Sequence, residues 1–223
     1  MFAECLSEVE TYVEATRRYQ APLLPNPVYV DLNFDSIRLK GAIPQVSAAG
    51  LLDYGFSNIS GKRLLALWIR HLCLCASTDP SVIAHRSVLI GGGESKVETF
   101  VLKAVKDPTK HLKQLVQHYQ EGRTQALPFF PKSSYFYASK IIKPGSRTTG
   151  EEKIKKAAMN KALNKWNDIN GKNGAPDIPG ECKDAAIRRF FGTKAPFEPA
   201  ESRFIDLSLD IYIPIFNHRE VQA

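Results

Sequence analysis

IRLKGAIPQVSAAGLLDYGFSNISGKRLLALWIRHLCLCA, residues 37–76, is the stretch from which the fold is predicted. It begins with two short segments, 37–46 and 51–56, that are rich in apolar and β-branched side chains. A Ser-Ala-Ala-Gly segment separates them, and this composition is typical of a turn between strands. The stretch therefore predicts two neighbouring strands.

The same stretch ends in a predicted helix over residues 61–76. Leu64, Leu67, Trp68 and Leu72 recur at the spacing of one helical face. Ser60 precedes this segment and is suited to the N-cap position. The predicted order of elements in this stretch is therefore strand, strand, helix.

This order is the frame on which restriction-type nucleases hold a divalent metal. In such sites one acid ends the first strand, and an acid-x-Lys sequence lies on the second. Leu51-Leu-Asp53-Tyr-Gly55 resembles the Leu-Leu-Asp-Tyr-Lys signature of the RecB nuclease domain, but Gly55 occupies the position of the lysine. Pro44 occupies the position at which such sites carry the first metal-binding acid. Because Mg²⁺ needs several hard oxygen ligands, Asp53 alone predicts a catalytically degenerate site with no metal.

A wider set of residues resembles the C-terminal domain of RecC, the gamma subunit of exodeoxyribonuclease V. Members carry a Gly-x-x-Pro-Gln motif, then Leu-Leu, then a leucine-tryptophan helix ending in Cys-Ala-Ser. The residues that fit in order are Gly41, Pro44, Gln45, Leu51, Leu52, Trp68, His71, Leu72, Cys75, Ala76 and Ser77. Further matches are Tyr119-Gln-Glu-Gly122 and Ile213-Pro-Ile-Phe216, so the resemblance extends from about residue 28 to the end.

This resemblance implies an α+β fold with a restriction-endonuclease-like PD-(D/E)xK core, in which a mixed sheet is flanked by helices. The chain, 1–223, is then one nuclease-like C-terminal domain of a longer subunit. Its sheet core covers about 28–140, and a C-terminal helical extension covers about 149–217.

The implied function is that of a non-catalytic scaffold in a bacterial helicase-nuclease that processes double-strand-break ends for recombinational DNA repair. The expected partners are RecB-like and RecD-like subunits, double-stranded DNA ends and separated single strands. No cofactor is expected in this chain, since Mg²⁺ and ATP belong to the partner subunits.

Two alternatives stay open. An active metal-dependent DNA nuclease would need migrated site residues, with Asp31 or Asp35 as a second acid and Lys62 or Arg63 in the lysine role. A self-standing nucleic-acid-binding protein would bind tightly and with strong salt dependence.

Composition is that of an ordinary globular protein, with 43% hydrophobic and 24% charged residues. No apolar run approaches the ~20 residues of a membrane span, and the N-terminus lacks the pattern of a signal peptide. Four cysteines without a disulfide-like framework predict reduced thiols and a cytoplasmic location. The net charge of +7 favours an acidic partner such as nucleic acid.

Two further segments are candidates for nucleic-acid contact. Residues 127–137, LPFFPKSSYFY, predict an aromatic loop that either covers the core or stacks on bases; the resemblance implies a wedge where duplex DNA opens. A predicted helix from 149 to about 170 carries a dense lysine face, which is either solvated or tracks phosphates. The candidates are Lys132, Tyr135, Tyr137, Lys140, Lys153, Lys155, Lys156, Lys161 and Lys165.

Elsewhere the pattern predicts a helix over 4–19 and a strand over 28–33 that joins 37–46 and 51–56 in a meander. A hairpin is predicted from 86–90 and 97–103. Three more helices are predicted: one that starts after Asp107 and ends before Gly122, with Tyr119 on its buried stripe, and then 182–191 and 202–216. The last is an apolar helix on which Ile205, Leu209, Tyr212 and Phe216 are expected to share a face.

Overall fold

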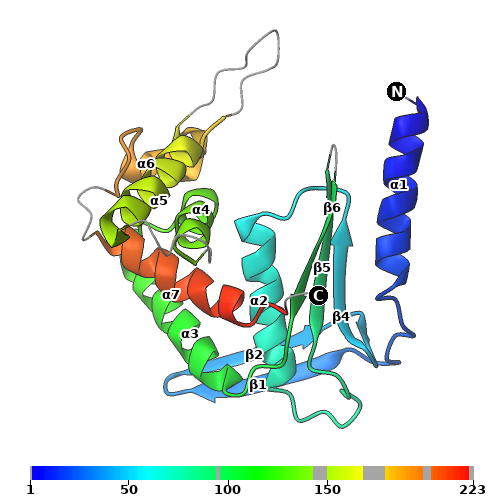
Figure 1. Cartoon of the computed structure of the whole chain (residues 1–223). Helices are drawn as coiled ribbons and strands as arrows, with labels where there is room; N and C mark the ends of the chain where they lie inside the picture. Colours follow the sequence, from blue (N-terminus) through cyan, green and yellow to red (C-terminus); the bar gives the residue numbers. More distant parts are fainter. Residues whose placement is uncertain (1, 94–95, 143–149, 168–178, 198–201, 221–223) are drawn as a thin grey trace. The chain divides into compact units, whose positions relative to one another are not determined.

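The computed structural model describes residues 2–93, 96–142, 150–167, 179–197 and 202–220 (Figure 1). The chain divides into two compact units. The first comprises Met1–Ile59, Arg63–Tyr119 and His218–Ala223, and the second comprises Ser60–Lys62 and Gln120–Asn217. Each unit has its own secondary structure and core, and the organisation of the chain as one domain stays a prediction.

The first unit is built on a four-stranded sheet with the strand order β3-β4-β5-β6. These strands are Val46–Ser47, Gly50–Gly55, Ser87–Gly93 and Lys96–Leu102. β4 and β5 are parallel, whereas the β3–β4 and β5–β6 pairs are antiparallel, so the sheet is mixed as predicted. Parallel neighbours need a crossover, and α2 (Gly61–Cys75) lies in the connection between β4 and β5 (Figure 1).

Helix α1 (Phe2–Arg17) packs against one face of this sheet. Tyr12 and Ala15 of α1, with Tyr19 just beyond it, contact a cluster that includes Leu52 of β4 and Val88 of β5. Successive side chains of a strand point to opposite faces. The residue after Leu52 therefore points away from α1, and this residue is Asp53.

The predicted meander is wrong. β1 (Val28–Phe34) and β2 (Ile37–Ile43) form a separate two-stranded sheet and do not pair with β4. The segment expected as one strand is interrupted after Ile43, because Pro44 has no N–H to donate and Gln45 has a left-handed φ of 58°. Pairing resumes at Val46, which lies opposite Leu51 in the short β3–β4 hairpin.

The predicted hairpin of β5 and β6 is confirmed, and the last described segment of the chain extends its pairing. Lys103 N donates to His218 O at 3.0 Å, and Glu220 N donates to Val101 O at 2.9 Å. Arg219 forms an isolated antiparallel bridge with Leu102. Residues 218–220 therefore pair along the end of β6.

Helix α3 (Pro108–Thr124) runs further than predicted. Gly122 lies inside it and not beyond its end. Tyr119, expected on the buried stripe, is 64% exposed, whereas Leu112 is buried. The buried stripe is therefore narrower than the apolar pattern suggested.

The second unit is helical, with α4 (Pro131–Ile142), α5 (Glu151–Trp166), the 3₁₀ turn η1 (Glu181–Lys183), α6 (Ala185–Phe191) and α7 (Arg203–Asn217). Its core contains aromatic and small residues from all of these helical segments except α6, together with one residue just before α4 and one between α6 and α7. The buried members are Phe130, Tyr137, Ala158, Ala162, Trp166, Cys182, Phe197 and Phe204.

The aromatic loop predicted over 127–137 is wrong, because α4 begins at Pro131. Proline is tolerated at the first helical position, where its missing N–H costs little. The buried carboxylate of Glu181 accepts from Lys132 N and Ser133 N, both at 2.7 Å, and from Ser133 Oγ at 2.7 Å. A helix N-terminus is thus capped by a residue about fifty positions away.

The remaining helices depart from prediction in smaller ways. α5 ends at Trp166, before the expected end near residue 170; positions 168–178 lie outside the described residues. The predicted helix 182–191 is divided into η1 and α6. α7 continues through Pro214, and of its predicted face only Tyr212 is fully buried, because Phe204, Leu207, Ile211 and Ile215 form the inner face instead.

The last two features of the fold are the state of the cysteines and the character of the helices. Among the described residues Cys73, Cys75 and Cys182 are free thiols, as predicted; the side chain of Cys5 lies outside that part. Within the same part of the chain, none of the helices has the length and apolar character that crossing a membrane requires.

Candidate functional site

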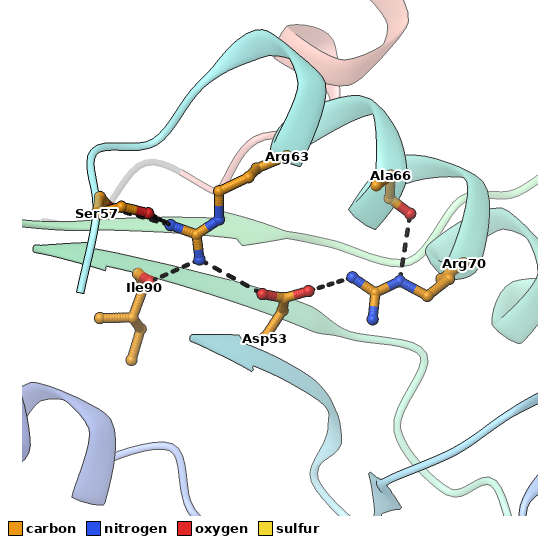
Figure 2. A network of polar contacts seen from close by, with 6 residues as sticks. All are labelled: Asp53, Ser57, Arg63, Ala66, Arg70 and Ile90. Atoms are coloured by element: carbon orange, nitrogen blue, oxygen red, sulfur yellow. Dashed lines mark hydrogen bonds and ion pairs between the residues drawn. The ribbon is translucent and has the colours of Figure 1, made fainter. Parts of the chain in front are cut away.

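Asp53 projects from β4 toward α2, as the alternation of the strand requires. Figure 2 shows its carboxylate between two guanidinium groups, those of Arg63 and Arg70, which lie two turns apart on that helix. Arg63 Nη2 lies 3.4 Å from Asp53 Oδ1. Arg70 Nη2 donates to Asp53 Oδ2 in a closer contact. Residues seven positions apart on a helix lie nearly on one face, so both arginines reach the same strand residue.

Both arginines are also held by backbone carbonyls. Arg63 donates to Ser57 O at 2.9 Å and to Ile90 O at 3.2 Å, and Arg70 Nε donates to Ala66 O at 3.3 Å (Figure 2). Asp53 and Arg63 are about three-quarters buried. This partly desolvated cluster joins β4, β5 and α2 through charge-assisted hydrogen bonds.

The Arg63 guanidinium also lies beside Gly55, the position at which a lysine is expected in the nuclease signature. A Cβ atom on Gly55 would lie 3.4 Å from Arg63 Nη2, so the space beside this glycine holds the Arg63 guanidinium. The positive charge beside Gly55 is thus supplied from α2. Arg63 had been considered for this role from the sequence, but Arg70 had not; its spacing from Arg63 was the available signal.

The other acids considered for a nuclease site are engaged elsewhere. Asp31 pairs with Arg38 of β2 at 2.6 Å, and this guanidinium lowers the pKa of the Asp31 carboxyl. Asp35 pairs with Lys113 at 2.9 Å. Pro44 is exposed and lies outside the strands. Within the described ranges, His, Cys, Asp and Glu form no group of three or more that could hold a metal ion.

The chemical consequence is a site with more positive than negative charge. Two guanidinium groups bind the Asp53 oxygens that would have to coordinate a metal. A divalent cation at this position would be repelled by both positive charges. Mg²⁺ requires several oxygen ligands in near-octahedral geometry. The arrangement fits an ion-paired structural cluster.

A second group of titratable residues surrounds Trp68. The ring centroids of His71, His111 and His218 lie 5.8, 5.7 and 5.4 Å from that of Trp68. Burial lowers the pKa of His71 to about 4, and burial together with His218 lowers the pKa of His111. His71 is therefore neutral at pH 7.

The hydrogen bonds of His71 define its tautomer. Nε2 lies 3.1 Å from Lys103 O, which only accepts, so Nε2 carries the proton. Nδ1 then accepts from Ser87 Oγ at 2.9 Å. His71 is a satisfied core histidine that joins α2 to β5 and to the residue after β6.

The lysine candidates on α5 remain accessible. Four of them, Lys153, Lys155, Lys156 and Lys161, are exposed. Lys155 pairs with Glu151 one turn earlier at 2.8 Å. Lys165 lies 4.5 Å above the ring of Phe136 and is partly shielded. The helix thus presents a basic outer face and an apolar inner face.

The candidates on α4 are less accessible. Tyr137 is 2% exposed and faces the core, so it is not available to stack on bases. Tyr135 is half-buried against Tyr212 and Phe216. Lys132 is exposed and Lys140 is partly exposed. The aromatic members of the segment therefore serve mainly the packing of this unit.

Comparison with known proteins matches residues 1–142 to the RecC C-terminal domain family. The chain belongs to this family. The match includes the first unit's sheet, the Asp53 cluster and α4, and it ends before α5; it does not extend to the end of the chain as the sequence had suggested.

One relative is the RecBCD enzyme subunit RecC of Escherichia coli (strain K12). It is 32% identical over 104 residues, which are 47% of this chain and 9% of the relative. The matched part thus spans less than a tenth of that RecC subunit.

Proposed function

We propose that this chain is a non-catalytic scaffold and DNA-contacting domain of the RecC subunit of a RecBCD-type helicase-nuclease, exodeoxyribonuclease V. Its family membership supports the role as part of such a subunit. The observation that carries the non-catalytic reading is the Asp53 carboxylate held by Arg63 and Arg70. In this role the former nuclease frame maintains the shape of the domain.

The proposed fold is restriction-endonuclease-like. Support comes from the order of β4, α2 and β5, in which the helix connects two parallel strands of a mixed sheet. Asp53 lies on the central part of β4, where the nuclease signature would place its acid.

The proposed DNA contact is supported by charge. The second unit carries 17 Lys and Arg residues and 11 Asp and Glu residues, so it holds +6 of the net charge of +7. Its densest exposed basic surface is the lysine face of α5 (Lys153, Lys155, Lys156 and Lys161). Lysines that neutralise phosphates release counterions, which makes binding salt-dependent.

The proposed setting is the bacterial cytoplasm, with RecB-like and RecD-like subunits as partners and broken double-stranded DNA ends as the ligand. The domain would contact a helicase subunit and help to separate the strands for recombinational repair. The partner subunits would bind and use ATP and Mg²⁺.

The alternative of an active nuclease has one observation in its favour, the Arg63 guanidinium at the lysine position. Among the described residues, the two acids that could complete such a site, Asp31 and Asp35, pair with basic residues elsewhere. The arrangement therefore supports the non-catalytic role better.

Fluorescence anisotropy with a labelled forked duplex, at about 50 mM and about 200 mM salt, tests the proposed DNA contact. Replacing three exposed lysines of α5, Lys153, Lys156 and Lys161, with Gln is expected to weaken binding at least about tenfold at low salt and to reduce the salt slope by about 2–3. The matched control replaces Lys103, Lys106 and Lys110, which are exposed on the first unit. It is expected to change affinity less than about twofold.

Equal losses in the two triple variants would place the contact elsewhere. Absence of any salt-dependent binding by the wild-type chain would overturn the proposed DNA contact and leave the scaffold role.

A further inference from the structure

The second unit contains an open groove of about 420 Å³ beside α6. One side is the C-terminal turn of α3 with the residues that follow it, and the other is α6. Its apolar lining comes from Leu127, Phe129, Phe130, Ile187, Phe190 and Phe191. Four of these six side chains are phenylalanines.

The groove has a fixed floor and an exposed wall. Phe130 is 1% exposed, and its ring lies edge-on to Trp166 at 4.8 Å and to Phe191 at 5.1 Å. Phe190, by contrast, is 69% exposed. The exposed Phe190 ring and the packed aromatic floor together form a continuous apolar surface that a ligand can cover.

The charges around the groove are mainly positive. Arg123 belongs to its lining, and Arg188 and Arg189 are exposed on α6. The neighbouring acids are engaged within the unit: Glu121 pairs with Arg203 at 2.5 Å, and Asp184 accepts from the backbone N–H groups that begin α6. The complementary ligand is therefore an anion with flat apolar parts.

We infer that this groove binds single-stranded nucleic acid, with bases stacked on Phe190 and its aromatic neighbours and phosphates beside Arg123, Arg188 and Arg189. Every base has a π-face, so such stacking tolerates any sequence. The bases of an intact duplex are already stacked and paired, so only an unpaired strand fits. This inference rests on the proposed DNA contact and adds the strand type and the site.

The test compares two labelled strands of equal phosphate number, an oligothymidylate of about 15 nucleotides and an abasic strand of the same length. Replacing the exposed Phe190 with Ala is expected to weaken oligothymidylate binding about tenfold and to leave binding of the abasic strand unchanged. Phe190→Trp is expected to restore binding, because the indole also stacks. The control Phe56→Ala removes a phenylalanine of similar exposure (55%) from the first unit and is expected to affect neither strand.

The other outcomes are distinct. If Phe190→Ala binds oligothymidylate as well as wild type does, while the forked duplex still binds, the groove inference fails and the DNA contact stands. If wild type binds neither strand nor the fork, both fail. If only an acidic peptide carrying Leu and Phe binds, and Phe190→Ala weakens it, the groove is a protein-docking site and the inference is overturned.

Discussion

The guanidinium of Arg63 lies beside Gly55, with its Nη2 atom 3.4 Å from the position of a Cβ on that glycine. A side chain at position 55 would compete for this space. The glycine at position 55 of β4 and the arginine at position 63 of α2 are therefore structurally complementary. The same guanidinium contacts the carboxylate of Asp53.

The first prediction concerns the stability of this cluster. Asp53→Ala leaves Arg63 and Arg70 close together without their shared anion, and it is expected to lower the free energy of unfolding by about 1–2 kcal/mol. The matched control is Asp31→Ala, whose pairs with Arg38 and Lys40 are exposed and which is expected to lower stability less than Asp53→Ala does. Urea unfolding measures both variants. Equal losses would show that the Asp53 cluster adds no more than a surface ion pair.

The second prediction concerns pH. Burial lowers the pKa of His71 to about 4 in the folded chain, below the ordinary value of 6.5. Because the unfolded chain then binds more protons, the contribution of His71 to stability is full above pH 6.5 and falls as the pH drops toward 4. Between about pH 7 and about pH 5 the loss is expected to be about 2 kcal/mol.

Urea unfolding of wild type and His71→Gln at both pH values isolates this effect. The variant is less stable at neutral pH but is expected to lose less stability on acidification. Parallel losses in both proteins would assign the acid sensitivity to other groups.

The third prediction concerns the cap of α4. Glu181 is 7% exposed and accepts three hydrogen bonds at the start of this helix. Glu181→Ala leaves these donors, two of which are buried, without their acceptor, and it is expected to cost about 2–4 kcal/mol. Glu181→Gln keeps one acceptor oxygen and is expected to cost less. Differential scanning calorimetry gives the comparison, and equal stability of all three proteins would contradict the capping role.

The fourth prediction uses two helical glycines. A Cβ on Gly61 would lie 2.3 Å from Pro131 O and 2.7 Å from Tyr212 Oη, so Gly61→Ala is expected to destabilise by about 1–3 kcal/mol. A Cβ on Gly122, inside α3, meets only Leu127, at 3.4 Å or more. Gly122→Ala is therefore expected to stabilise by about 0.5–1 kcal/mol through helix propensity. Opposite signs in urea unfolding support these packing assignments, and the same sign in both would contradict them.

Local patterns predicted the elements that local interactions determine. The helix through Leu64 and Trp68 and the β5–β6 hairpin were predicted nearly to their observed ends. The pairing of β2 could not be read in this way, since an amphipathic strand can join either sheet. α4 was missed because its cap, Glu181, is remote in sequence and its aromatic side chains read as a loop.

The candidate site was predicted in part. The pattern identified Asp53 with its missing partners, and it offered Arg63 as one replacement cation. The spacing of Arg63 and Arg70 by two turns of α2 was present in the sequence, but only the sheet geometry shows that both reach Asp53. The groove beside α6 combines segments more than fifty residues apart, and no local pattern indicates it.

The most direct test of the central claim is a cleavage assay on a labelled forked duplex with Mg²⁺ or Mn²⁺, using wild type and Asp53→Ala. The account predicts that wild type binds the fork and leaves it intact with either metal, and that Asp53→Ala does the same. Metal-dependent cleavage by wild type that disappears in Asp53→Ala would contradict the account and establish an active nuclease site around Asp53 and Arg63.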